Sequence, residues 1–293
     1  MSFNGFSAFT ESPVFENIIK KEALSLNIAF TCFYGSRNYS LETDKSDYDF
    51  FIVYYPVFEN FFIHRFPRSS VIEKDYDYFI TPFHEYFRHA MNGNIKFIEP
   101  LMCNTVFRVD ASPERFYARE QAEQGLERSL RWKDFKLIEK VKNFIAVNFK
   151  KNFDAMAGII KNKKLNVEKG LYTSNTLKYK ESHGYDIKEA INSLRIAFLL
   201  EHYINTGEFS FEVKQNPVYK EFEIYLSGIN DKKISKNYYL EIINKKIDDI
   251  AGRYEKLGAK EKPGGTLRVE IKRKIEQDIV EICRDKACFA KNN

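Results

Sequence analysis

The sequence predicts an α+β fold, in which an N-terminal mixed sheet with flanking helices is followed by a helical region. Two observations lead to this fold class. Short apolar runs such as Ile28–Phe33 and Phe50–Tyr55 occupy the N-terminal third, and such runs are typical of buried strands. From Asp110 onward, apolar residues recur with a period near 3.6, which is typical of amphipathic helices. We therefore expect two domains, residues 1–108 and 109–293.

The composition is that of a globular protein and disfavours several functional classes. Hydrophobic residues make up 44% and charged residues 30% of the 293 residues, which are not the values of a disordered chain. The net charge of +5 is too mildly basic to indicate a dedicated DNA-binding domain, but it is compatible with a polyanionic partner such as a nucleotide. We attribute the high aromatic content, 16%, to core packing.

The spacing of the cysteines and the length of the apolar runs indicate whether to expect a zinc site, a membrane span or a secreted protein. No two of the four cysteines form a Cys-x-x-Cys pair, so we expect reduced thiols and no zinc site. No apolar run reaches the roughly 18 residues that a membrane span needs, and Met1–Gly5 lacks the pattern of a signal peptide. We therefore expect a cytoplasmic protein without a membrane partner. The cysteines are Cys32, Cys103, Cys283 and Cys288.

The elements of the N-terminal domain are predicted in turn. Ser12-Pro13 indicates the start of a helix, and its apolar stripe should cover the sheet. The two apolar runs then predict two strands. The segment Ile72–Ile80 alternates charged and aromatic residues and predicts a further strand. Thr81-Pro82 indicates a helix that runs to about Asn92.

The C-terminal region is predicted to be mostly helical, with a basic connection at the lysine-rich stretch Lys161–Lys180 and breaks at Asn216-Pro217, Leu226–Asp231 and Lys262–Gly265. Its helices are recognised by apolar stripes at helical spacing. They are Trp132 to about Lys151, a helix that opens at Gly184, Asn237–Leu257 and Thr266–Cys283.

Two aspartates at the start of the second apolar run are the first candidate site residues. Asp47 and Asp49 flank Tyr48. Residues two apart in a strand face the same side, which places their Cβ atoms roughly 6–7 Å apart. Adjacent carboxylates repel each other unless a cation lies between them, and two Mg²⁺ ions about 3.5–4 Å apart are usual in phosphoryl-transfer enzymes. We expect two Mg²⁺ ions here, with Mn²⁺ as the alternative.

A Gly-Ser turn precedes the aspartates. Gly35-Ser36 ends the first predicted strand, and glycine allows a tight turn that aims backbone N–H groups at a phosphate. The serine hydroxyl could contact the same phosphate. The alternative interpretation is an ordinary strand-turn-strand with surface aspartates.

These residues resemble a known family. Gly-Ser, a spacer and then Asp-x-Asp on the next strand are similar to the signature of the DNA polymerase beta-like nucleotidyltransferase superfamily. The fuller strings Gly35-Ser36-Arg37 and Ser46-Asp47-Tyr48-Asp49 resemble one branch, the predicted nucleotidyltransferases of bacteria and large tailed phages. That branch often has a small residue or glycine shortly after Gly-Ser-Arg, where this chain has Asn38–Leu41. Because of this departure, the resemblance does not predict the shape of this loop.

A second block resembles the same branch. In the branch an acidic residue precedes a helix that ends in Gly-Asn, and a glutamate follows five residues after the asparagine. Here these residues are Asp77, Gly93-Asn94 and Glu99. The resemblance implies that Asp77, or alternatively Glu99, is the third metal-binding carboxylate. The structural alternatives are a solvated strand carboxylate for Asp77 and a helix-cap or salt-bridge role for Glu99.

The resemblance also implies a reaction. A Mg²⁺-dependent enzyme would move an NMP from an NTP, with ATP as the expected donor, to an acceptor hydroxyl on RNA, protein or a small molecule, and would release pyrophosphate. Gly35, Ser36 and Arg37 would hold the β- and γ-phosphates. The alternative is a catalytically idle nucleotide- or RNA-binding protein on the same fold. The expected location is the cytoplasm of a bacterium or of a phage-infected host.

The helix that opens at Gly184 carries the last match to the branch. Tyr185, Lys188 and Arg195 occupy the matching positions, and Lys188 and Arg195 are seven residues apart, so they share one helix face. We expect these residues to reach the nucleotide from the helical side of a cleft between the domains. The alternative is that the two basic residues are simply solvated.

Overall fold

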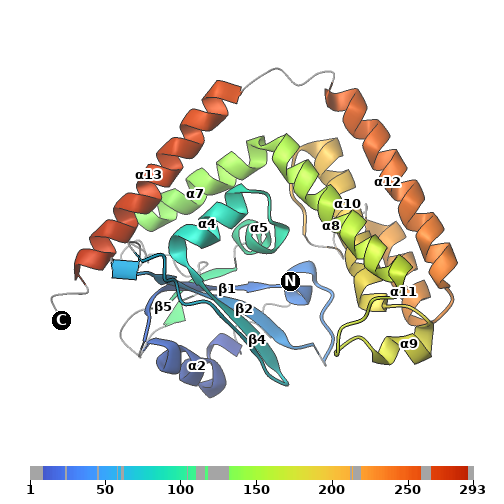
Figure 1. Cartoon of the computed structure of the whole chain (residues 1–293), viewed down its shortest axis with the longest axis horizontal. Coiled ribbons are helices and arrows are strands. Elements are labelled where there is room, and N and C mark those ends of the chain that lie inside the picture. Colours follow the sequence, from blue (N-terminus) through green and yellow to red (C-terminus); the bar gives the residue numbers. More distant parts are fainter. Residues whose placement is uncertain are drawn as a thin grey trace. The chain divides into compact units, whose positions relative to one another are not determined.

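The computed structural model describes residues 9–23, 25–44, 46–57, 59–60, 63–103, 105–109, 116–117, 132–211, 213, 219–258 and 265–289. Within these ranges the fold is α+β, as predicted (Figure 1). Contacts divide the chain into two compact units, and the first holds the described residues up to Met91, Lys96–Phe144 and those from Thr266 onward. The second holds Asn92–Ile95 and Ile145–Gly265. The division into domains at residue 108 stays a prediction.

The first unit is built on one mixed sheet. Its strand order is β3-β4-β2-β1-β5-β6. Strands β2 and β4 are parallel, whereas the other neighbouring pairs are antiparallel. The strands are β1 Asn27–Tyr34, β2 Tyr48–Tyr55, β3 Ser69–Ile72, β4 Tyr76–Pro82, β5 Val106–Val109 and β6 Phe116–Tyr117.

The strand predicted at Ile72–Ile80 exists from Tyr76 onward as β4, but its predicted beginning is wrong, because the segment crosses a hairpin. Strand β3 ends at Ile72, and β4 begins at Tyr76. The chain reverses between them, where the backbone N–H of Glu73 donates to the carbonyl of Tyr76 at 3.0 Å. The turn is the charged run Glu73–Asp75, which interrupts the period of two expected of one continuous strand. The hairpin places β4 beside β2 and parallel to it.

One face of the sheet packs against α2, which spans Pro13–Ala23 (Figure 1). Its start is as predicted, because the Ser12 hydroxyl accepts a hydrogen bond from the backbone N–H of Phe15 at 3.2 Å and caps the first turn. Alternate residues of the strands meet the apolar stripe of this helix. The buried core on this side includes Phe15, Ile18, Ile19, Phe33, Phe50, Ile52, Tyr78 and Ile80.

The opposite face is covered by α4, Phe83–Met91, and α5, Ile95–Met102 (Figure 1). Ring contacts join these layers: the Phe51 ring lies 5.7 Å from that of Tyr86 and 4.8 Å from that of Phe97, measured between centroids. The helix predicted to open at Thr81-Pro82 exists but begins at Phe83, since both residues still belong to β4. This face also carries the candidate site.

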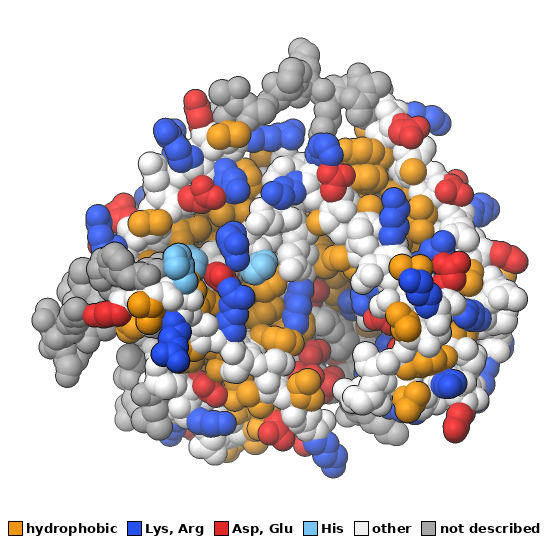
Figure 2. All heavy atoms as spheres, in the orientation of Figure 1, with side chains coloured by type: hydrophobic (Ala, Val, Ile, Leu, Met, Phe, Trp, Pro, Cys, Tyr) orange, Lys and Arg blue, Asp and Glu red, His pale blue; other side chains and the backbone are white. Residues whose placement is uncertain are grey.

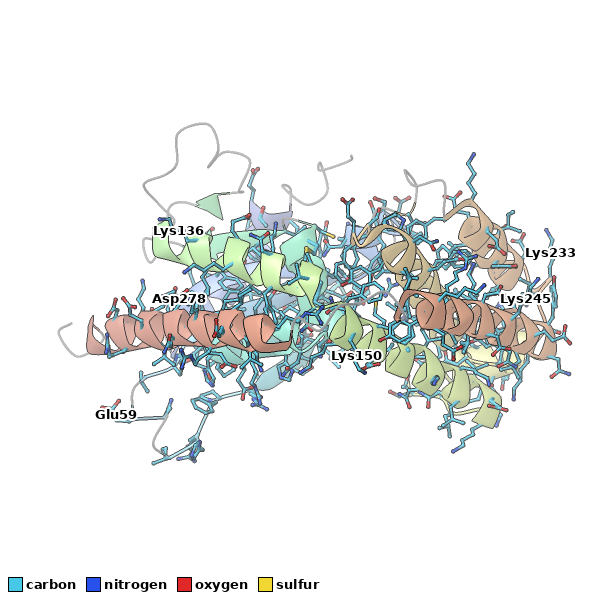
Figure 3. The ribbon with its side chains drawn as sticks, turned by 90° about the horizontal axis from the view of Figure 1, so that it is seen from above. Glu59, Lys136, Lys150, Lys233, Lys245 and Asp278 are labelled. Carbon is cyan, nitrogen blue, oxygen red and sulfur yellow. The ribbon has the colours of Figure 1, made fainter. Side chains whose placement is uncertain are left out.

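Two helices with their own ion pair complete the described part of the first unit. Lys140 lies on α7, Trp132–Val147, and Asp278 lies on α13, Gly265–Phe289. The ammonium of Lys140 is 2.6 Å from a carboxylate oxygen of Asp278, which is labelled in Figure 3. The periodicity predicted both helices, but the end predicted near Lys151 is wrong, because α7 ends at Val147 and the next helix, α8, begins at Phe149.

The second unit is a set of helices around α10. Helix α10 contacts α8, α11 and α12, and Asp186 caps it by accepting the backbone N–H groups of Lys188 and Glu189. The basic connection predicted at Lys161–Lys180 is wrong in its first half, because α8 continues to Lys169 and ends at Gly170 in the left-handed conformation. The helices are α8 Phe149–Lys169, α9 Lys178–His183, α10 Ile187–Thr206, α11 Lys220–Asn230 and α12 Lys236–Gly258.

Surface charge and helix hydropathy agree with the composition. Figure 2 shows basic and acidic side chains interspersed over the displayed face, as the small net charge of +5 suggests. Among the helices of the described ranges, none is long and apolar enough to cross a membrane. The cellular location stays a prediction.

Candidate metal centre

Three aspartates converge where β2 and β4 begin. Asp49 and Asp77 are register partners on these parallel strands, so their side chains leave the same face of the sheet side by side. Asp47 immediately precedes β2, which starts at Tyr48. One carboxylate oxygen from each of the three residues lies within 4.8 Å of the other two. All three aspartates are half-buried.

This donor set suits a hard divalent cation. Mg²⁺ binds oxygen ligands at about 2.0–2.1 Å, so ligands on opposite sides of one ion are roughly 4 Å apart. The oxygens of the three aspartates lie within 4.8 Å of one another, and carboxylate oxygens are the ligands that Mg²⁺ and Mn²⁺ prefer. The carboxylates of Asp47, Asp49 and Asp77 could therefore hold a metal ion.

The turn beside the cluster requires glycine. Gly35 has φ 89° and ψ −150°, a region that only glycine occupies without strain. A Cβ atom at this position would lie 2.7 Å from a carboxylate oxygen of Asp49. The glycine therefore has two functions, because it makes the turn and lets the backbone approach the metal-binding carboxylate.

Glu99 of α5 ties that turn to the helix layer. Its carboxylate accepts the backbone N–H of Gly35 at 2.5 Å, and its side chain is buried, with 3% exposure. The three carboxylates that converge are those of the aspartates. Glu99 is not one of them and instead contacts the backbone of the turn. The N–H of Gly35 is thus engaged within the protein in this structure.

Ser36 and Arg37 begin the short 3₁₀ helix η1, Ser36–Tyr39, and both are half-buried. The guanidinium of Arg37 donates to the backbone carbonyl of Ser46 at 2.8 Å and to that of Asp47 at 3.4 Å. It also lies 3.7 Å above the centre of the Tyr48 ring. Arg37 therefore holds the segment that positions Asp47, and its expected contact with phosphate stays a prediction.

Lys96 is the site residue that sequence reasoning missed. Its ammonium lies 3.5 Å from the ring centre of Phe79 and 4.2 Å from that of Tyr34. Burial lowers the pKa of Lys96 to about 8, while the charges of Asp49, Glu99 and Asp77 act in the opposite direction. One signal was available. Lys96 and Glu99 are the charged residues of an otherwise apolar helix and are three apart, so they share a face.

The expected nucleotide contacts of the helical region lie in the second unit. Tyr185 is buried, and its hydroxyl donates to the carbonyl of Ile234 at 2.9 Å, so it serves the core of that unit. Lys188 is exposed and Arg195 is half-buried. Their approach to a nucleotide stays a prediction.

Comparison with known proteins does not identify a family. The sequence matches no protein-family model and no curated protein. A functional assignment for this chain therefore has to be argued from the carboxylate cluster and the turn beside it.

Proposed function

We propose that this protein is a Mg²⁺-dependent nucleotidyltransferase. It would move an NMP from an NTP, with ATP as the expected donor, to an acceptor hydroxyl on RNA, protein or a small molecule. The observation that carries this proposal is the convergence of Asp47, Asp49 and Asp77 within 4.8 Å, beside a turn whose glycine abuts Asp49. The arrangement agrees with what the resemblance to the DNA polymerase beta-like superfamily implies.

Each residue would contribute one function to an in-line displacement. The acceptor hydroxyl gives up its proton to solvent and its oxygen forms a bond to the α-phosphorus, while the bond from that phosphorus to the leaving pyrophosphate breaks. Asp47, Asp49 and Asp77 would hold the metal, which when bound activates the acceptor hydroxyl and offsets charge on the leaving group. The Ser36 hydroxyl would contact the β- and γ-phosphates. Arg37 would keep Asp47 in place through the carbonyls that it already binds.

The test is a transfer assay that leaves the acceptor open. Each of the four NTPs, labelled at the α-phosphate, is incubated with the protein, Mg²⁺ and a cell lysate. The products are then separated into RNA, protein and small molecules. We expect Mg²⁺-dependent label in one of these fractions. The matched control is Asp49→Asn with Asp77→Asn, which keeps the size of both side chains but removes their charge and should transfer no label.

One pattern of results contradicts the enzyme. If the protein binds an NTP in equilibrium dialysis yet transfers no label from any of the four, it is the catalytically idle binder. Label transfer that survives in the Asp49→Asn, Asp77→Asn variant would instead place the chemistry elsewhere in the chain. Either result overturns the proposed function.

A further inference from the structure

Lys96 is held above the sheet by rings from three neighbouring strands. Phe51 and Phe79 are register partners on β2 and β4, and each lies two residues after an aspartate of the cluster. Their rings therefore lie on the same face as those carboxylates, one step further along the strands. The ammonium of Lys96 lies 3.5 Å from the Phe79 ring centre and 5.4 Å from that of Phe51.

Tyr34 of β1 completes this aromatic seat. The Lys96 ammonium lies 4.2 Å from its ring centre, and Tyr34 is the register partner of Asp49 on the antiparallel strand. Aromatic faces attract cations, and Lys96 itself belongs to α5. The positive charge is thereby fixed at the edge of the carboxylate cluster.

Negative charges outnumber positive charges around this aromatic seat. Asp49, Asp77 and Glu99 each favour the charged form of Lys96, and Asp47 joins two of them in the cluster. Three carboxylates thus act on one ammonium, and a fourth lies beside two of them. The other nearby cation, Arg37, directs its guanidinium at the backbone carbonyls of Ser46 and Asp47.

We propose that Lys96 is a built-in counter-charge of the carboxylate cluster and that it limits how tightly the cluster binds a divalent cation. Without metal it offsets repulsion among the carboxylates. With metal it repels the incoming ion and keeps the affinity low enough for exchange. This inference rests on the metal site of the proposed function, and it makes Lys96 a positioning residue rather than a catalytic one.

The test is the affinity for Mn²⁺ alone, measured by the electron paramagnetic resonance signal of the unbound ion. Lys96→Met keeps an unbranched apolar stem against the rings and removes the charge. We expect it to bind Mn²⁺ at least about tenfold more tightly than the wild type, since a unit charge within a few ångströms acts strongly on a divalent ion. A damaged fold would weaken binding, so tighter binding cannot come from structural damage.

Two further variants serve as controls. Lys96→Arg keeps the charge, and we expect it to stay within about threefold of the wild-type affinity. Lys74→Met removes an exposed lysine from the β3–β4 turn of the same unit and should leave Mn²⁺ binding unchanged. If Lys96→Met binds Mn²⁺ no more tightly than the wild type, the counter-charge role is overturned.

Folding of the variant gives an independent readout. If Lys96→Met unfolds without metal, the inference requires that Mn²⁺ restore the fold, because the ion then replaces the missing charge. A variant that stays unfolded in excess Mn²⁺ overturns the inference.

Failure of the inference and failure of the proposed function give different results. Wild-type binding that disappears in Asp49→Asn, Asp77→Asn but is unaltered in Lys96→Met overturns only the role of Lys96. Absence of Mn²⁺ binding in the wild type and in Lys96→Met alike overturns the metal site, and the proposed function with it. If Lys96→Met binds Mn²⁺ and the wild type does not, the inference is supported, because the charge of Lys96 then prevents binding altogether.

Discussion

Two buried glutamates lie on neighbouring helices over the same face of the sheet, and their partners differ. Glu85 of α4, 6% exposed, pairs with the guanidinium groups of Arg68 and Arg88. Glu99 of α5, 3% exposed, accepts the backbone N–H of Gly35 and is attracted to the charge of Lys96. Residue type and burial are therefore the same at both positions, and only the partners distinguish them.

The comparison distinguishes Glu85, which forms ion pairs that serve the fold, from Glu99, which lies beside the candidate metal site. Two arginines balance Glu85, so its charge is satisfied by the fold itself. Glu99 instead holds the Gly35 turn, which lies beside a cluster of three aspartates whose combined negative charge suits a divalent cation. Changes near Glu85 should therefore act on stability, whereas changes near Glu99 should act on metal binding and transfer.

The largest effect is expected from Asp47→Ala combined with Asp49→Ala. Loss of two metal ligands should lower NMP transfer by at least about 100- to 1,000-fold, the range for removing one strong electrostatic contact in an active site. The melting temperature without metal should stay the same or rise, because two mutually repelling carboxylates are removed. Label transfer and thermal unfolding are the measurements. Wild-type turnover in the double variant would falsify the metal-assisted mechanism.

Gly35→Ala should lower both stability and metal binding. The added Cβ would meet Asp49 at 2.7 Å with φ at +89°, and we expect a loss of about 1–3 kcal/mol in the free energy of unfolding. Displacement of Asp49 should also weaken Mn²⁺ binding. Urea unfolding and Mn²⁺ titration check both effects.

The matched control for that variant is Gly170→Ala in the second unit. Gly170 also has a positive φ, +65°, but a Cβ there would have no neighbour within 4 Å. We expect a cost of about 1–2 kcal/mol from the backbone alone and unchanged Mn²⁺ binding. Equal Mn²⁺ affinities in the two alanine variants would mean that Gly35 only makes a turn.

Glu85→Gln should act on stability alone. It leaves two guanidinium groups without their carboxylate, but both arginines are more than half exposed, so water screens part of the loss. We expect the free energy of unfolding to fall by about 1–2 kcal/mol, with transfer unchanged. Urea unfolding measures the free energy of unfolding, and the label-transfer assay measures the activity. Reduced transfer at unchanged stability would reverse the roles assigned to the two glutamates.

The smallest effect is expected from Glu99→Gln. The amide oxygen can still accept the N–H of Gly35, so the free energy of unfolding should change by less than about 1 kcal/mol. Removal of one negative charge should weaken Mn²⁺ binding by about three- to tenfold. Glu73→Gln, on the exposed β3–β4 turn, is the control and should change neither quantity. A stability loss as large as that of Glu85→Gln would show Glu99 to be a structural residue too.

Several features of the fold and site could be predicted from short stretches of sequence, because they depend on residues that are close in the chain. The hydroxyl of Ser12 caps the helix that it precedes, and the apolar runs form β1 and β2. The proximity of Asp47 and Asp49 also follows from their spacing. Period and capping are local properties, so they are visible without the fold.

Other features depend on pairings between distant segments. The β3–β4 hairpin places β4 parallel to β2, and this pairing brings Asp77 opposite Asp49. The match to the branch marked Asp77 as a candidate, but it did not give the register. The superfamily and the reaction stay proposals.

The sequence by itself determined the α+β class, most of the elements and two adjacent carboxylates. Only the tertiary structure decided that Glu99 accepts the N–H of Gly35 and that Lys96 lies over the rings of Tyr34 and Phe79. These contacts join α5 to strands far from it in the chain. No local pattern encodes them, because the close packing of the helix layer on the sheet decides which side chains meet.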